Sequence, residues 1–195
     1  MRFRAGALDD VVVFESEAHA DDRGYFVRTL DADVLRDAGL DHRTFAEESQ
    51  SRSRGGVVRG LHGRKHLSEG KLVRCARGAI FEILVDLRPW SSTFLQHDTI
   101  VLDDVDHRQV WVPPGFVHGF AVLSDFADVC YHMDAPHVPG LDLAIAWDDP
   151  DLALPWPVTD PVLSERDRSA PLLAAVRAEL PRWFGGQPPS STPTG

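Results

Sequence analysis

Short apolar or alternating segments dominate the middle of the chain, between residues 70 and 133. Gly, Pro, Asp or Ser residues separate them at a spacing of roughly ten residues, which is typical of strands joined by tight turns. Many short strands at such a spacing indicate a β-sandwich or a β-barrel. The pattern therefore predicts a mainly β fold, with strands in KLVRCARG, AIFEILVDLR, TIVLDD, RQVWVPP, GFAVLSD and ADVCYHM.

Two further segments have the pattern of short helices. In LDADVLRDAGL, Asp31 is a candidate N-cap and Gly39 a candidate stop. In APLLAAVRAELPRW, apolar side chains recur with helical spacing at Leu172, Leu173, Val176 and Leu180. We expect both helices to lie outside the β structure.

The length of 195 residues and the apolar content of 43% suit one core of ordinary size, so we expect a single domain over residues 1–184. The last stretch, 185–195, reads GGQPPSSTPTG and is expected to be disordered because it has nothing to bury. The first twenty residues lack the apolar core of a secretion signal, and no run approaches the ~20 apolar residues of a membrane span. A cytoplasmic protein is expected, with Cys75 and Cys130 reduced inside strands.

Charge is distributed unevenly along the chain, whose formal net charge is −10. Between Arg52 and Arg77 there are eight Lys or Arg residues and one acid, Glu69, so this segment carries +7 and the remainder −17. A strongly acidic balance argues against nucleic acid as a partner, because phosphate backbones are bound through accumulated positive charge. The basic segment is either a solvated face or a local anion site, and its interleaving with apolar residues favours a lined pocket.

The segment VWVPPGFVHGFAV has the pattern of a strand, a tight turn and a second strand. If side chains alternate along the second strand, His118 points inward, either as a core histidine bonded to the backbone or as part of a site. The spacing of Pro113, Gly115 and His118 resembles that of the cupin barrel, whose mouth holds a metal or an organic ligand. We therefore predict a cupin, a jelly-roll-like double-stranded β-helix barrel, with a few short peripheral helices.

Histidine and acidic residues in RGLHGRKHLSEGKLV, residues 59–73, raise the possibility of a metal site. His62, His66, Glu69 and His118 together form a ligand set suited to Fe, Mn, Ni or Zn. However, His62 and His66 are four positions apart, and on one strand such residues lie ~13 Å from each other. This spacing weakens the metal interpretation, although a loop could still bring the two rings together.

Seven motifs in order show that the chain resembles the dTDP-4-dehydrorhamnose 3,5-epimerase family, which are metal-free cupins acting on nucleotide-linked keto-sugars. The resemblance runs from about residue 10 to 170. Together the motifs are far more specific than any one of them. They are DDRGYF (21–26), GVVRGLH (56–62), GKLVRCARGAIFEILVDLR (70–88), WVPPGFVHGFAVLSD (111–125), VCYHM (129–133), WDDP (147–150) and LSERD (163–167).

The resemblance implies a metal-independent epimerase without a cofactor. A 4-keto group acidifies the neighbouring C–H bonds, and epimerisation removes a proton from one face and returns it to the other. By motif match, His62 is the base, Asp167 its carboxylate partner, and Tyr131 the acid on the opposite face. Lys71 matches the residue that stabilises the enolate. A carboxylate at the second ring nitrogen would fix the imidazole tautomer and raise its basicity.

The resemblance also implies a set of substrate-binding residues for a dTDP-linked 4-keto-6-deoxy sugar. Arg23 and Arg59 match diphosphate-binding arginines, for which planar bidentate donors are well suited. His118 matches a barrel histidine that contacts the substrate, and Arg166 a basic residue near the nucleotide. The remaining candidate substrate-binding residues are Phe26, Arg28, Glu47, Ser51 and His137. Family members are homodimers in which an N-terminal segment reaches the partner's site, so a homodimer is implied.

Several positions depart from the family pattern. Gly63 and Arg64 replace a Tyr-Gln pair after the base. Glu47, Glu48 and Ser49 stand where the family has Gln-Asp-Asn, so the amides are lost and the segment is more acidic. Arg28 replaces a glutamate that contacts thymine, and it cannot accept the N–H of the base. Pro136 and His137 replace aromatic residues, although His137 could still stack on a base.

These changes lead to the hypothesis that only one carbon, C3 or C5, is inverted, in the making of a specialised deoxysugar. A barrel that binds nucleotide sugars without catalysis remains the alternative from a different class.

Overall fold

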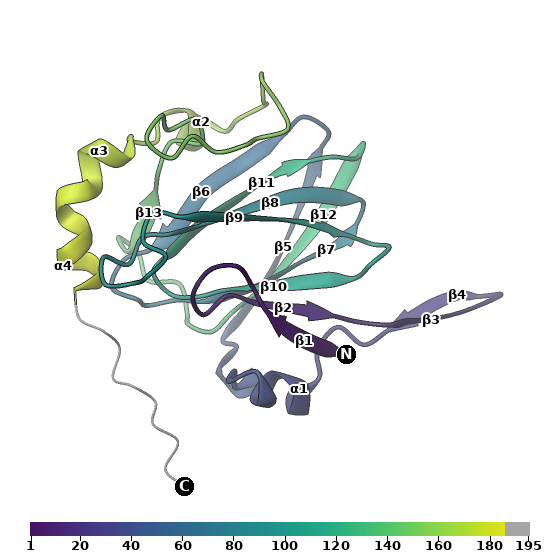
Figure 1. The fold of residues 1–195 in the computed structure, drawn as a ribbon. Helices are drawn as coiled ribbons and strands as arrows, with labels where there is room; N and C mark the ends of the chain where they lie inside the picture. Colours follow the sequence, from purple (N-terminus) through teal and green to yellow (C-terminus); the bar gives the residue numbers. More distant parts are fainter. Residues whose placement is uncertain (186–195) are drawn as a thin grey trace, which may run out of the picture.

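Two antiparallel sheets face each other in the computed structural model, which describes residues 1–185 (Figure 1). The six-stranded sheet has the order β1 (Arg2–Ala5), β2 (Val12–Glu15), β10 (Arg108–Val112), β7 (Lys71–Arg77), β12 (Phe126–Met133) and β5 (Glu47–Arg54). The five-stranded sheet has the order β13 (Asp142–Ala144), β6 (Val58–Arg64), β11 (Phe116–Val122), β8 (Ala79–Asp86) and β9 (His97–Asp103). A separate hairpin, β3 (Ala18–Asp21) and β4 (Gly24–Val27), extends away from both sheets.

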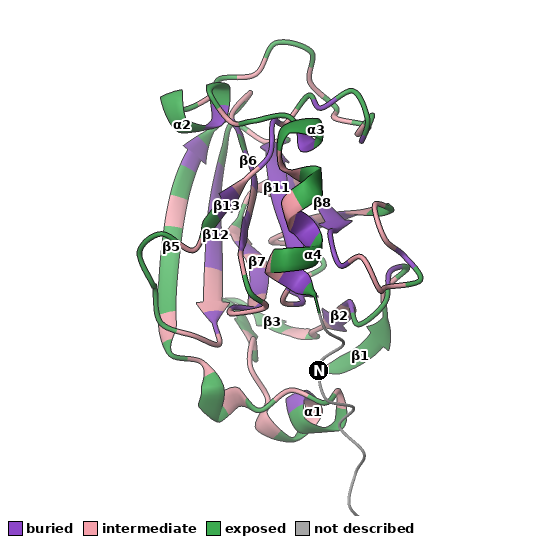
Figure 2. Cartoon of the chain, turned by 90° about the vertical axis from the view of Figure 1, so that its left-hand side faces the viewer, coloured by how far each residue is buried: buried purple, intermediate pink, exposed green. Residues whose placement is uncertain are grey.

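All six strands predicted between residues 70 and 133 are confirmed, and the mainly β, cupin-like fold is confirmed with them. The sequence pattern did not reveal the earlier strands, β5 and β6 above all. β5 reads EESQSRSR and has no apolar residue, because it is an edge strand that is mostly exposed (Figure 2). It forms by pairing with β12 along all eight of its residues. Apart from Gly185, the tail predicted to be disordered lies outside the described residues.

The main core lies between the two sheets and follows the alternation of each strand. In β11, Phe116, Phe120 and Val122 point inward, and in β7 Val73 does the same. Because side chains two apart share a face, His118 in β11 and Lys71 in β7 also point between the sheets. Strand alternation thus delivers polar side chains into an otherwise apolar interior.

The outer faces of the sheets are covered by short helices. α1 (Ala32–Asp37) contributes the fully buried Leu35 to a cluster on the six-stranded sheet. Its predicted cap is confirmed, since the Asp31 side chain accepts hydrogen bonds from the N–H groups of Asp33 and Val34. Gly39, just beyond its end, has a φ of +83°, which suits the predicted stop. Two further short helices are η1 (His42–Thr44) and α2 (Glu165–Arg168).

The C-terminal helix predicted over 170–183 is broken into three parts. These are α3 (Leu173–Val176), η2 (Arg177–Glu179) and α4 (Leu180–Phe184). Pro181 lies in the first turn of α4, where its missing N–H breaks no helical bond, but it cannot continue a preceding helix. Of the residues with helical spacing, Leu173 and Leu180 are buried against the five-stranded sheet, whereas Leu172 precedes the helix and is exposed. No helix among residues 1–185 is long and apolar enough to cross a membrane.

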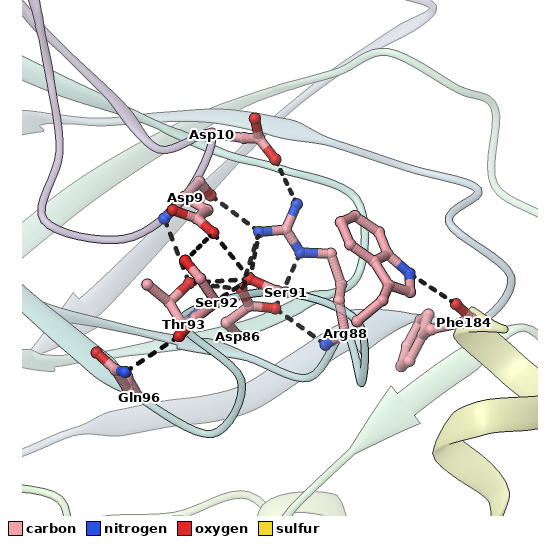
Figure 3. Close-up of polar contacts among 10 residues, drawn as sticks. Asp9, Asp10, Asp86, Arg88, Ser91, Ser92, Thr93, Gln96 and Phe184 are labelled. Atoms are coloured by element: carbon pink, nitrogen blue, oxygen red, sulfur yellow. Dashed lines mark hydrogen bonds and ion pairs between the residues drawn. The ribbon is translucent and has the colours of Figure 1, made fainter. Parts of the chain in front are cut away.

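A buried ion pair ties the loop between β1 and β2 to the end of β8 (Figure 3). The Arg88 guanidinium donates to both carboxylate oxygens of Asp86, at 2.9 and 2.8 Å, and to Asp10 Oδ2 at 2.6 Å. Ser91 and Thr93 hydroxyls also donate to Asp86. Asp86 is fully buried, so its charge depends on these donors.

Replacing Arg88 should therefore destabilise the protein strongly. Arg88→Leu leaves a buried carboxylate without its cation, and we expect a loss of about 3–5 kcal/mol in the free energy of unfolding, measured by urea denaturation. The matched control is Arg36→Ala, which breaks an exposed pair with Asp33 and should leave the midpoint almost unchanged. Equal midpoints for the two variants would contradict the structural role of Arg88.

Candidate active site

The pairing of β6 with β11 sets the positions of two candidate site residues. His62 lies opposite His118, and Arg59 lies opposite Phe120, with an irregularity in the register between them. Gly60 and Leu61 therefore face a single residue, Gly119, as in a β-bulge. The extra residue lets Arg59 and His62, three positions apart, point to the same side of the sheet. Gly60 has a φ of +129°, and a Cβ there would lie 2.6 Å from the Cα of Gly119.

A cavity of about 280 Å³ opens between the sheets at this point. Six residues singled out from the sequence line it, and they come from five different strands and both sheets. A larger surface hollow of about 670 Å³ lies at the β1, β2 and β10 edge and contains none of the predicted site residues. The six lining residues are Ser51, Arg59, His62, Lys71, His118 and Tyr131.

His62 and Asp167 form a hydrogen-bonded pair behind the cavity wall. His62 Nε2 is 2.5 Å from Asp167 Oδ1, although the two residues are far apart in the chain. Asp167 is in α2, where its N–H donates to Ser164 Oγ, and its side chain is only 4% exposed. Burial raises the pKa of Asp167, but the His62 hydrogen bond and charge outweigh burial and leave this pKa below its usual value. An ionised Asp167 thus holds the His62 tautomer and leaves Nδ1 to accept a proton.

Tyr131 reaches the cavity from β12 on the opposite sheet. Its hydroxyl lies 3.1 Å from Ser51 Oγ, and its ring is packed against the main core. Burial is the main reason why the pKa of Tyr131 is raised above its usual value, and the Ser51 hydrogen bond only partly offsets it. The phenol therefore remains protonated at neutral pH and can serve as a proton donor.

His118 is buried beside an acidic residue that the sequence interpretation missed. Its Nδ1 is 2.6 Å from Glu82 Oε1, and Glu82, in β8, is completely buried. The available signal was a charged residue inside the apolar run AIFEILVD, at a position whose neighbours Ile80 and Leu84 point inward. Because burying a carboxyl group costs free energy, its presence in an apolar strand indicates a specific partner or role.

Lys71 is held at the cavity by an ion pair with Glu69, which is in turn paired with Arg64. Its Nζ lies 3.3 Å from Glu69 Oε1, and the other oxygen of Glu69 accepts from Arg64 Nε at 3.2 Å. Arg64, itself 9% exposed, also pairs with Asp142 at 3.0 Å. The residue that departs from the family pattern at position 64 is thus used to position Glu69 and, through it, Lys71.

The four side chains considered as metal ligands do not converge. His66 is exposed on the loop after β6, while Glu69 is engaged by Arg64 and Lys71. Over residues 1–185, no group of three or more His, Cys, Asp or Glu side chains is arranged to hold a metal ion. The geometry of the ligand set therefore does not fit the metal alternative.

Three more predicted substrate-binding residues lie together, outside the cavity lining, around Asp142 and Glu47. Glu47 Oε1 accepts from the N–H of His137 at 2.8 Å. His137 Nε2 and Arg166 Nη2 lie 3.7 and 3.8 Å from the Asp142 carboxylate. Glu47, His137 and Arg166 are therefore grouped by the fold, although they come from three separate segments.

Arg23, Phe26 and Arg28 also lie outside the cavity lining, and they are not part of the group around Asp142. Arg23 is at the tip of the β3–β4 hairpin, with its side chain 89% exposed and paired with Asp21. Phe26 is 67% exposed, and Arg28 pairs with Asp31 at 3.0 Å. None of these three residues lines the cavity that contains His62 in the same chain.

The basic segment between Arg52 and Arg77 is only partly used by the cavity. Of its eight cations, Arg59 and Lys71 line the cavity wall. Arg52 is neutralised by Asp128 at 2.6 Å, and Arg64 by Glu69 and Asp142. Of the basic residues that suggested an anion site, only Arg59 and Lys71 are thus positioned at the cavity.

Known proteins share both this sequence pattern and this architecture. A sequence model described as dTDP-4-dehydrorhamnose 3,5-epimerase matches residues 5–175. The chain is 40% identical over 171 residues to the enzyme of that name from Methanothermobacter thermautotrophicus, covering 86% of this chain and 92% of that protein.

Solved structures agree. NovW, a 4-keto-6-deoxy sugar epimerase from the novobiocin cluster of Streptomyces spheroides, superposes with a TM-score of 0.87 at 37% identity, covering 91% of this chain and 90% of that one. ChmJ, a 3'-monoepimerase from Streptomyces bikiniensis in complex with dTDP-quinovose, gives 0.84 at 28% identity, covering 91% and 90%. With the His62–Asp167 pair facing Tyr131 in the same barrel, the chain belongs to the dTDP-4-dehydrorhamnose 3,5-epimerase family.

Proposed function

We propose that this protein epimerises a dTDP-linked 4-keto-6-deoxy sugar by removing a proton next to the keto group and returning one to the opposite face. The observation that carries the proposal is the His62–Asp167 pair and the Tyr131 hydroxyl lining one cavity from opposite sheets. A base and an acid on opposite walls are what inversion at a carbon requires.

His62 Nδ1 takes the proton from the carbon, and Asp167 stabilises the imidazolium that forms. The negative charge moves to the keto oxygen, where Lys71 supplies a cation held by Glu69. Tyr131, protonated at neutral pH, then delivers its proton to the far face of the enolate. No step needs a cofactor or a metal ion.

The sugar is a specialised one, inverted at a single carbon, C3 or C5. Support comes from position 63, where the family has tyrosine: a Cβ on Gly63 would lie 2.3 Å from the carbonyl oxygen of Phe116, so the strand leaves no room for a side chain. Together with the Arg64–Glu69 pair, this reshapes one side of the site. The likeness to ChmJ, a 3'-monoepimerase, is a precedent for single-carbon chemistry on this fold.

The active form is a homodimer in which the β3–β4 hairpin enters the partner's site. The hairpin projects from the barrel (Figure 1) and carries exposed Tyr25 and Phe26 beside Arg23, a combination suited to a base and a diphosphate. A cytoplasmic location agrees with two free, buried cysteines. The domain extends over residues 1–184.

Regiochemistry can be read from proton exchange. Incubating dTDP-4-keto-6-deoxyglucose with chelator-treated protein in D2O should remove one NMR signal, that of the C3 or the C5 hydrogen, and give an inverted product. Loss of both signals with inversion at both carbons would contradict the single-carbon proposal. If neither signal is lost but the nucleotide sugar binds, the barrel is a binding protein and the catalytic proposal is wrong.

The same assay should distinguish the contribution of the base from that of the acid. His62→Ala should lower the rate of deuterium exchange by about 10²–10⁴-fold, since the proton-abstracting group is gone. Tyr131→Phe should reduce inversion more than exchange, because the enolate still forms but is reprotonated from the wrong face. Ser49→Ala, a change in another residue of the cavity lining, is the matched control and should affect both rates equally and weakly.

Complementation tests the shared site. His62→Ala and the double variant Arg23→Ala/Phe26→Ala should each be nearly inactive alone. A mixed dimer has one site with an intact His62 and an intact hairpin, so mixing and re-equilibrating the two should restore up to about half of the activity per mixed dimer, as follows from two-fold symmetry. If the hairpin serves its own chain, mixing restores nothing, and sedimentation of a monomer would refute the dimer directly.

A further inference from the structure

Glu82 is the one completely buried carboxyl of the cavity region, and the mechanism above leaves it without a role. It points between the sheets from β8, in line with Ile80 and Leu84. Oε1 contacts His118 Nδ1 at 2.6 Å, while Oε2 is buried and has no hydrogen-bond partner among residues 1–185. An ionised carboxylate with one oxygen unsolvated would be costly, whereas the carbonyl oxygen of a neutral acid tolerates this far better.

The surroundings of the pair do not favour ionisation of both members. The titratable or charged groups facing the pair are Lys71 from β7, His62 and Arg59 from β6, and Tyr131 from β12. Burial raises the pKa of Glu82 well above its usual value, and Lys71 opposes this only in part. Burial, followed by the charges of Lys71 and His62, holds the pKa of His118 well below its usual value. Both shifts favour the neutral forms of the two groups.

We propose that Glu82 is a protonated positioning residue: its O–H donates to His118 Nδ1 and thereby fixes the tautomer in which Nε2–H is presented to the cavity. The proposal rests on the epimerase function above and deepens it. His118 then acts as an uncharged hydrogen-bond donor to the substrate oxygen on which the enolate charge develops, beside the cation of Lys71. With an ionised Glu82 instead, Nδ1 would carry the proton and Nε2 would present a lone pair, which repels that oxygen.

This arrangement explains why one histidine of the cavity, His62, is a proton acceptor and the other, His118, is a hydrogen-bond donor. Asp167 is ionised and engages Nε2 of His62, so His62 presents a basic nitrogen. Glu82 is protonated and engages Nδ1 of His118, so His118 presents an N–H. Two acids in different surroundings thus assign opposite functions to two rings that lie opposite each other on β6 and β11.

The tautomer can be measured without substrate, which separates this proposal from the epimerase function. In the 15N-histidine-labelled wild-type protein, long-range 1H–15N NMR should show His118 with a bare, hydrogen-bond-accepting Nδ1 and a protonated Nε2. His118→Asn provides the assignment. A protonated Nδ1 with a bare Nε2 would overturn the proposal whether or not the protein proves to be an epimerase.

Kinetics test the consequence. Glu82→Gln keeps a neutral donor toward Nδ1 and should lower kcat for exchange by only about tenfold or less, since an amide polarises the ring less than an acid. Glu82→Leu removes the donor and should lower kcat about 10²–10³-fold, the usual effect of losing one oxyanion contact, with little change in KM. If Glu82→Gln loses as much activity as Glu82→Leu, an ionised Glu82 is required and the proposal is wrong.

Discussion

The antiparallel pairing of β6 with β11 is the interaction on which the site depends. It places His62 opposite His118, and its bulge at Gly60 and Leu61 turns Arg59 to the same side as His62. The bulge is possible because Gly60 and Gly119 lack side chains at their point of closest approach. A shift of one residue in this register would turn His62 to the outer face, since successive side chains on a strand point to opposite sides.

Polar groups in the interior are tolerated because each has a partner suited to its charge. Asp167 is ionised and meets His62, Lys71 meets Glu69, and the phenol of Tyr131 meets the Ser51 hydroxyl. These side chains are mostly buried, so their contacts act in a lower dielectric and are stronger than they would be on the surface. Burial raises the pKa of the acid Tyr131. Burial also acts to raise the pKa of Asp167, the partner of the base, but the hydrogen bond and charge of His62 outweigh it and lower this pKa.

Helices cover the outer faces of the sheets, but the β3–β4 hairpin has no covering element among residues 1–185. Helices α3 and α4 cover the five-stranded sheet and α1 part of the other, whereas β3 and β4 project from the barrel (Figure 1) and leave Tyr25 and Phe26 more than half exposed. Exposed aromatic rings on a projecting element are characteristic of interaction surfaces. The proposed dimer therefore completes both the fold and the site at once.

Local chemistry in the sequence determined much of this protein. Alternating apolar residues specified the strands from 70 to 133, the Asp31 cap specified the start of α1, and the motif matches singled out His62 and Tyr131. These features can be read from sequence because strand faces, helix caps and motif residues depend on near neighbours.

Only the tertiary structure decided how distant residues meet. Asp167 reaches His62 across a large separation in sequence, and Arg64 binds Glu69 and Asp142 instead of facing the substrate. Glu82 is a charged residue in an apolar strand when read along the chain, and its partner and its complete burial appear only when β8 lies beside β11. Burial and partnership depend on which strands become neighbours, and through them the fold sets the protonation states that the chemistry uses.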